Sequence, residues 1–179
     1  MCGDHDLAIA TLAAEEMPGY IPALAALLHA CVHAGASISF VLPFRQDDAA
    51  GFWTARVLPA MRAGGQLLLV AREGGCLVGT VQLGTDTPPN QPHRAEVSKL
   101  LVHPERRRRG IARALMAALE REARARGRSL ITLDTRTGDA AEPLYTALGY
   151  RTVGTIPGYC VDPFDPACLE STTIMYKVL

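Results

Sequence analysis

Four consecutive arginines, at positions 106–109, stand directly before a glycine and a helix-like segment. An apolar segment, residues 100–102, precedes them and ends near Pro104, which is typical of a strand that leads into a turn. After Gly110, apolar side chains recur at helical spacing, at Ile111, Leu115, Ala118 and Leu119. A glycine where a strand turns into a helix leaves backbone N–H groups open at the positive end of the helix dipole. The sequence therefore predicts a phosphate-binding turn.

Other interpretations of this turn must be compared with a phosphate-binding site. A P-loop requires Gly-x-x-x-x-Gly-Lys followed by Ser or Thr, and the turn has no such sequence. A Rossmann fingerprint requires three glycines after the first strand of an alternating parallel fold, and neither condition is met. Four arginines also fit a nucleic-acid patch or a solvated face. However, Lys plus Arg equals Asp plus Glu at 18 each, and no aromatic stacking platform accompanies the run, so we expect no nucleic-acid partner.

Two motifs carry a resemblance to a known family. One is the strand and turn just described, and the other is the segment 141–150, which reads Ala-Glu-Pro-Leu-Tyr-Thr-Ala-Leu-Gly-Tyr. The first motif reads Leu100-x-Val102-x-Pro104, then Arg107-x-x-Gly110-x-Ala112. In both, the chain resembles the GCN5-related N-acetyltransferase (GNAT) superfamily. The resemblance implies an α/β fold with a mixed, mostly antiparallel sheet, splayed between its fourth and fifth strands, and helices on both faces.

The same resemblance implies acetyl-CoA as the cosubstrate. Backbone amides from Arg108 through Arg113 would hold the pyrophosphate, with the side chains of Arg107 and Arg109 as the first candidates for further contacts. Main-chain groups of the strand before the turn would pair with the pantetheine arm, and one amide would face the thioester oxygen. The implied coenzyme-binding residues are Leu100, Leu101, Val102, Arg107, Arg108, Arg109, Gly110, Ile111, Ala112 and Arg113.

Attack on a thioester requires a neutral amine, so a group that accepts a proton is needed. The resemblance gives this role to Glu96 and Asp134, and the role of general acid toward the CoA thiolate to Tyr145. Strand alternation predicts that Glu96 shares a side with Leu100 and Val102, and its apolar neighbours predict a raised pKa.

Each of these residues also has a structural alternative. Glu96 could be an edge glutamate paired with Arg94 or Lys99, Asp134 could cap a helix, and Tyr145 could be a packed core residue. Whether Glu96 or Asp134 is the main proton acceptor stays open.

A narrower resemblance concerns the acceptor. Residues 33–40, 93–100, 133–135 and 157–160 resemble the tabtoxin resistance group of these acetyltransferases. This implies a small amine acceptor and a role in toxin or antimetabolite resistance. His33, Ser37 and Phe40 are candidates to line the acceptor pocket. Acetylation of a protein N-terminus or lysine is the alternative, and a homodimer is left open.

Hydrophobic periodicity predicts the elements that must position these residues, in the order β-α-α-β-β-β-α-β-α-β-β, within one domain spanning residues 1–179. Strands are expected at residues 7–11, 67–71, 76–83, 95–102, 129–134, 150–156 and 172–178. A first helix is expected at residues 15–34, with the helix proper starting near Pro22. A second helix is expected from a cap at Asp47 or Asp48 to about Arg62. Two further helices are expected from the arginine turn to Gly127 and at residues 140–148.

Composition excludes several classes of protein. Apolar residues make up 49% of the chain, yet no stretch approaches the roughly 18 apolar residues of a membrane span. The first six residues are polar and acidic, unlike the basic start of a signal peptide. Five cysteines without close spacing argue against a disulfide framework and a zinc site. We therefore expect a cytoplasmic protein with no membrane partner and no metal.

Overall fold

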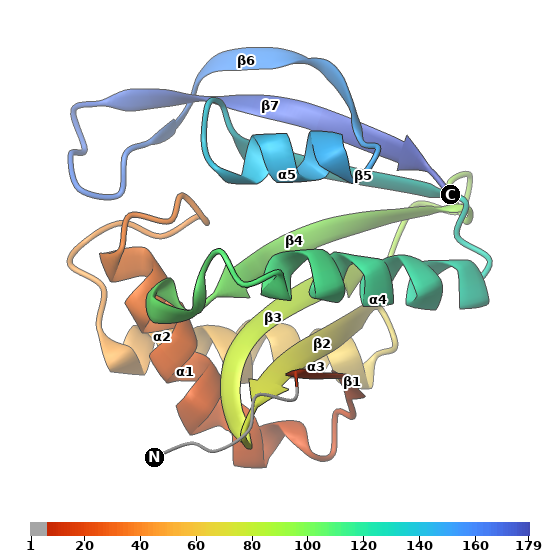
Figure 1. The fold of residues 1–179 in the computed structure, drawn as a ribbon, viewed down its shortest axis with the longest axis horizontal. Helices are drawn as coiled ribbons and strands as arrows, with labels where there is room; N and C mark the ends of the chain where they lie inside the picture. The colour runs from red at the N-terminus through yellow and green to blue at the C-terminus, as the bar shows by residue number, and fades with distance from the viewer. Residues whose placement is uncertain (1–6) are drawn as a thin grey trace.

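A computed structural model describes residues 7–179 (Figure 1). The strands are β1 (Leu7–Leu12), β2 (Gln66–Glu73), β3 (Cys76–Gly84), β4 (Arg94–Val102), β5 (Leu130–Arg136), β6 (Arg151–Val161) and β7 (Leu169–Val178). The α-helices are α1 (Met17–His33), α2 (Gln46–Phe52), α3 (Leu58–Arg62), α4 (Ile111–Ala125) and α5 (Ala141–Ala147). A π-helical turn, η1 (Trp53–Val57), joins α2 to α3, and a 3₁₀ turn, η2 (Pro104–Arg106), follows β4. The predicted order of elements is confirmed.

The strands form one sheet in the order β1-β2-β3-β4-β5-β7-β6. Every neighbouring pair is antiparallel except β4 and β5, which run parallel. These two strands pair only over their first residues, where Arg94, Ala95 and Glu96 face Leu130, Ile131 and Thr132. Beyond Glu96 the two strands separate, so the predicted splay is confirmed. The splay leaves one edge of β4 without a partner strand in the middle of the sheet.

Helices cover both faces of the sheet, as predicted (Figure 1). On one face α4 buries Ile111, Leu115 and Leu119 against apolar residues of β2, β3 and β4. On the other face α1, α2 and α3 enclose a second core around the fully buried Trp53. The α4 helix thus rests on the same strands that border the splay, which places its N-terminus beside the open edge of β4.

Two predictions about the N-terminal helices need correction. The first helix starts at Met17 and not near Pro22, because Pro18 fits the first turn and the burial of Met17 and Leu24 offsets the hydrogen bond that Pro22 cannot donate. The second helix is interrupted by η1, one turn before Pro59. Pro59 has no N–H group, which disturbs the regular pattern of helical hydrogen bonds. Asp48 assists the start of α2 from within the helix, where its carboxylate accepts a hydrogen bond from the Arg45 N–H at 2.8 Å.

Gly79 on β3 allows α4 to lie close to the sheet. A Cβ atom at this position would lie 2.9 Å from the Leu101 carbonyl oxygen and 3.1 and 3.2 Å from side-chain carbons of Leu115 and Ile111. Gly79→Ala is therefore expected to lower the free energy of unfolding by about 1–3 kcal/mol, because α4 must move outward. Urea denaturation measures this change. The matched control is Gly19→Ala in α1, where a Cβ meets nothing within 4 Å and stability should hold or rise by up to ~1 kcal/mol. Equal stability of Gly79→Ala and the wild type would contradict this packing account.

Candidate functional site

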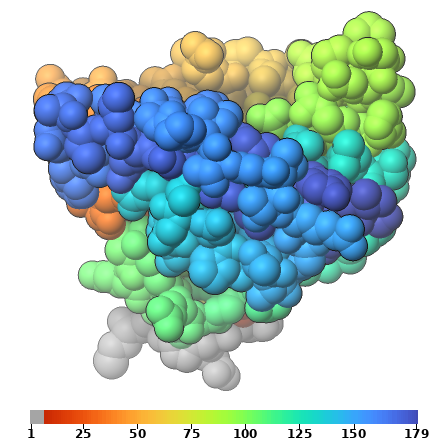
Figure 2. Space-filling model, turned by 90° about the horizontal axis from the view of Figure 1, so that it is seen from above, coloured from red at the N-terminus to blue at the C-terminus, as the bar shows by residue number. Residues whose placement is uncertain are grey.

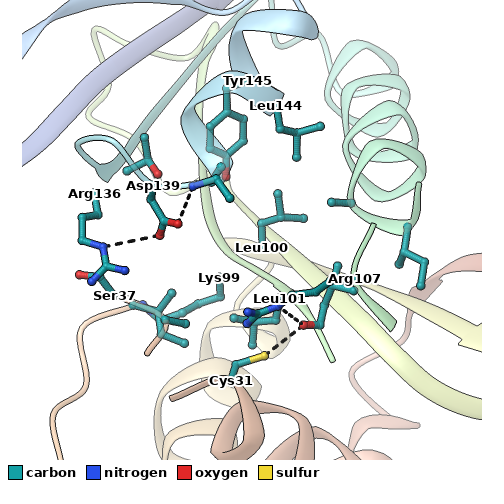
Figure 3. A pocket seen from close by; sticks show the side chains of 18 of the residues that line it. Cys31, Ser37, Lys99, Leu100, Leu101, Arg107, Arg136, Asp139, Leu144 and Tyr145 are labelled. Carbon is teal, nitrogen blue, oxygen red and sulfur yellow. Dashed lines mark hydrogen bonds and ion pairs between the residues drawn. The ribbon is translucent and has the colours of Figure 1, made fainter. Parts of the chain in front are cut away.

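A cavity of about 670 Å³ occupies the splay between β4 and β5 (Figure 3). Its walls come from the loop after α1, the second half of β4, the arginine turn with the first residues of α4, the end of β5, and α5. These segments are far apart in the chain. The cavity therefore depends on the sheet topology and on no single motif.

A bulge at Lys99 reverses the alternation of β4. Lys99 has a left-handed backbone (φ 50°), and the pairing of β3 with β4 is irregular opposite it. Ala95 and Val97 pack on the α4 face, but Leu101, which strict alternation would place beside them, packs on the α1 face. Leu100 and Val102 turn toward α4 instead, and all three residues from 100 to 102 line the cavity. The open edge of β4 offers main-chain groups to a peptide-like ligand at this point.

This bulge corrects the prediction for Glu96. The side chain points to the face opposite Leu100 and Val102, and it does not line the cavity. It is 57% exposed, so it does not lie in the apolar surroundings that the sequence predicted. Its carboxylate lies 3.4 Å from the Arg94 guanidinium, which was the structural alternative. Glu96 still marks the vertex of the splay, because it belongs to the last pair between β4 and β5.

Asp134 and Tyr145 both line the cavity. The Asp134 carboxylate accepts a hydrogen bond from the Thr172 hydroxyl at 3.2 Å, and it caps no helix because α5 begins only at Ala141. Tyr145 is 5% exposed, and Figure 3 shows its side chain directed into the cavity. Its ring packs edge to face against the ring of Tyr150, with the two ring centroids 5.6 Å apart. Burial, and then the negative charges of Asp134 and Asp139, raise the pKa of Tyr145. Its phenol therefore keeps its proton and can donate it.

The arginine turn adopts the shape that its glycine predicts. Gly110 has a left-handed backbone (φ 81°) and is the N-cap of α4, so the first N–H groups of that helix point out of its end. Arg108 is also left-handed (φ 65°). Gly110, Ile111, Ala112 and Arg113 line the cavity together with Arg106, Arg107 and Arg108.

The side chain of Arg109 does not line the cavity, which differs from the prediction. It donates to the Glu73 carboxylate at 3.2 Å, and Arg106 lies 3.7 Å from the same carboxylate. Glu73 ends β2 and is buried. Arg107 donates through Nε to the Val102 carbonyl oxygen at 3.4 Å, so it stays against the C-terminal end of β4. No pattern in the sequence indicated the Glu73 contact, because the hairpin that contains Glu73 and the arginine turn are far apart in the chain.

Of the three predicted acceptor-pocket residues, the structure brings only Ser37 into the cavity. Its hydroxyl lies 3.7 Å from the Cys160 sulfur. His33 lies elsewhere: its Nε2 is 2.9 Å from the Phe44 carbonyl oxygen, and its ring stacks on His29. Phe40 lies beneath Lys99, whose Nζ is 5.6 Å from the ring centroid. Phe40 therefore supports a cavity residue and does not line the cavity.

Segments from the two halves of the sheet meet beside the end of the cavity that Gly35, Ser37 and Arg136 line. The Leu42 N–H donates to the Pro163 carbonyl at 2.9 Å, and a Cβ at Gly35 would lie 2.8 Å from the ring of Phe164. Arg136 of β5 donates to both carboxylate oxygens of Glu170, at 3.0 and 3.1 Å, and to the Gly35 carbonyl at 3.3 Å. Figure 2 shows the end of the β6–β7 hairpin beside the α1–α2 region. These contacts hold the loop after α1 against the β6–β7 hairpin beside the cavity.

The GNAT family model matches residues 33–150, which include α1's end, β4, the arginine turn and Tyr145. This match covers more than half of the chain. The chain belongs to the acetyltransferase (GNAT) family.

Curated GNAT relatives are similar over part of the chain. An acetyltransferase of Yersinia enterocolitica is 39% identical over 92 residues, which are 51% of this chain and 62% of the relative. An acetyltransferase of Pectobacterium atrosepticum is 43% identical over 91 residues, which are 50% of this chain and 61% of the relative. The chain thus spans about three-fifths of the length of these relatives.

Solved GNAT structures share the fold over nearly the whole chain. The acetyltransferase yncA of Salmonella typhimurium, solved with its cofactor acetyl-CoA, superposes with a TM-score of 0.75 at 22% identity, covering 97% of this chain and 94% of that one. A ribosomal-protein-alanine N-acetyltransferase of Brucella melitensis gives 0.78 at 24% identity, covering 96% and 99%. At these identities the likeness establishes the GNAT fold. The acceptor must be argued from this chain's own residues.

Some features of this GNAT site were not predicted from the sequence. Lys99, Arg136 and Asp139 all line the cavity, and Cys31 donates from its floor to the Val102 carbonyl at 3.5 Å. Burial raises the pKa of the Cys31 thiol. Within residues 7–179 no group of three or more metal-ligating side chains comes together, and no helix there is long and apolar enough to cross a membrane. No disulfide joins the cysteines of that part of the chain, and Cys2 lies outside it.

Proposed function

We propose that this protein is an acetyl-CoA-dependent N-acetyltransferase that acetylates a small amine by direct attack on the thioester. One observation carries the proposal: a single cavity joins the N-terminus of α4, the unpaired edge of β4, Asp134 and Tyr145. The helix N-terminus suits a pyrophosphate, and the open strand edge suits the amides of pantetheine. The residues present therefore fit acetyl-CoA, which would supply the acetyl group.

The proposed chemistry assigns roles to Asp134, Glu96 and Tyr145. The amine nitrogen bonds to the thioester carbon, the carbon–sulfur bond breaks, and the amine proton passes to Asp134, or through water to Glu96 at the vertex. Tyr145 gives its proton to the departing thiolate, and its raised pKa means that the phenol is protonated when this step begins. A main-chain amide of residues 100–102 would stabilise the oxyanion.

We assign the end of the cavity lined by Gly35, Ser37 and Arg136 to the acceptor, and we call it the acceptor end. The contacts between the segments beside it support a small acceptor. A protein N-terminus or lysine would need an open groove, whereas the loop after α1 and the β6–β7 hairpin meet through Arg136 and through the Leu42 and Pro163 main chains. The resemblance to the tabtoxin resistance group supports a role against a toxin or antimetabolite. A homodimer and a cytoplasmic location stay predictions.

The test is release of the CoA thiol from acetyl-CoA in the presence of three sets of acceptors: small amines, peptides with a free N-terminus, and lysine-containing peptides. We expect turnover with small amines at least tenfold above that with peptides, and a rise in melting temperature with acetyl-CoA. Preferred turnover of peptides would overturn the small-acceptor part. Neither turnover nor a melting shift would overturn the proposed activity itself.

A further inference from the structure

The Lys99 ammonium has an unusual position at the acceptor end of the cavity. At the left-handed bulge this side chain reaches the edge of the core around Trp53, where its Nζ lies 5.6 Å from the ring centroid of Phe40 and 5.7 Å from that of Phe52. The Ser39 hydroxyl accepts a hydrogen bond from it at 3.3 Å. Aromatic faces and a hydroxyl stabilise a cation without neutralising it. This part of the cavity therefore keeps a positive charge.

The other charges around the acceptor end differ in their pairing. Arg136 has the carboxylates of Asp139, Asp162 and Glu170 within 4 Å, so its charge is more than compensated. Lys99, in contrast, has no carboxylate within 4.0 Å among residues 7–179. Burial lowers the pKa of Lys99, and the negative charge of Asp134, which lies across the splay beyond ion-pair distance, offsets part of this effect. A half-buried cation on one side thus faces a carboxylate on the other.

We propose that the acceptor is a small amino-carboxylate, whose amine lies toward Asp134 and whose carboxylate binds the Lys99 ammonium. This inference rests on the proposed function and adds the substrate class. The pairing is complementary: the carboxylate supplies the counter-charge that Lys99 lacks, and the amine meets the group that can take its proton. Ser39 and the two phenylalanine rings hold Lys99 in place, which explains how Phe40 serves the site without lining it.

The experiment compares amino acids with their amides and with the corresponding decarboxylated amines, at fixed acetyl-CoA, in the wild type and two variants. A hydrogen-bonded charge pair is worth about 1.5–3 kcal/mol, so the wild type should prefer the carboxylate forms about 10- to 100-fold in kcat/KM. Lys99→Met should remove that preference through a higher KM for the carboxylate forms. It should affect the amides much less than the carboxylate forms, whereas Lys99→Arg should keep part of the preference.

The outcomes distinguish a wrong substrate class, a different role for Lys99, and a failure of the proposed function. Equal use of carboxylate and amide forms by the wild type would overturn this one while leaving the proposed activity intact, and that comparison needs no variant. If Lys99→Met lowered kcat for all acceptors alike and shifted the pH profile, Lys99 would be a proton acceptor and not a specificity residue. If no amine were acetylated in any form, the proposed function would fail and this inference with it. Thermal melting of each variant reports whether its fold is intact.

Discussion

Replacing Tyr145 by phenylalanine is expected to lower kcat about 100-fold or more, with the KM for acetyl-CoA changed less than about twofold, since general acid catalysis contributes 10²- to 10⁴-fold. The phenol is buried in the cavity, and burial with the charges of Asp134 and Asp139 keeps its proton in place. Without the hydroxyl, the CoA sulfur must leave as an unprotonated thiolate or take its proton from water. The ring packing is retained, so coenzyme binding should hold.

Steady-state kinetics with detection of the CoA thiol measures this effect. Tyr150→Phe is the matched control, because that ring touches Tyr145 edge to face but does not line the cavity. The control should keep kcat within about twofold. Because the pKa of Tyr145 is raised, the wild-type rate should also show no fall near pH ~10, where an ordinary tyrosine ionises. Unchanged kcat in Tyr145→Phe would assign this tyrosine to packing alone.

Replacing Asp134 by asparagine is expected to lower kcat by about 100-fold, and Glu96→Gln by less than about tenfold. Asp134 lines the cavity and is oriented by the Thr172 hydroxyl, which an asparagine oxygen can also accept. The Glu96 carboxylate is 57% exposed and paired with Arg94. Water can therefore replace it as a proton acceptor.

The measurement is kcat for both variants and their combination. A larger loss in Glu96→Gln than in Asp134→Asn would reverse the assignment and make the vertex glutamate the main proton acceptor. The double variant should lose little more than Asp134→Asn alone if the two carboxylates serve the same proton path.

The shape of the arginine turn could be predicted from the sequence because its determinants are local. A left-handed glycine at the N-cap, apolar residues at helical spacing and a preceding strand all lie between Leu100 and Leu115. Helix N–H groups point out of the helix end wherever the helix sits. Tyr145 was predictable for the same reason, since it belongs to a short motif that runs from α5 into β6.

The face of the sheet on which Glu96 lies, relative to Leu100 and Val102, could not be predicted from local sequence patterns. Alternation along a strand has a period of two, so one left-handed residue, Lys99, reverses the faces of every residue beyond it. Arg109 shows a second limit. Its direction depends on Glu73, a residue of another hairpin that no pattern in the arginine run reveals.

The sequence by itself determined the order of the elements, the turn that suits a pyrophosphate and the family resemblance, because these depend on residues close together in the chain. Tertiary structure alone decided the acceptor end. There the contacts join Arg136 to Gly35 and Leu42 to Pro163, and the Lys99 ammonium gains its aromatic support only where the loop after α1 folds beneath β4. Which charges face the acceptor follows from packing between distant segments, and that packing sets the specificity that we propose.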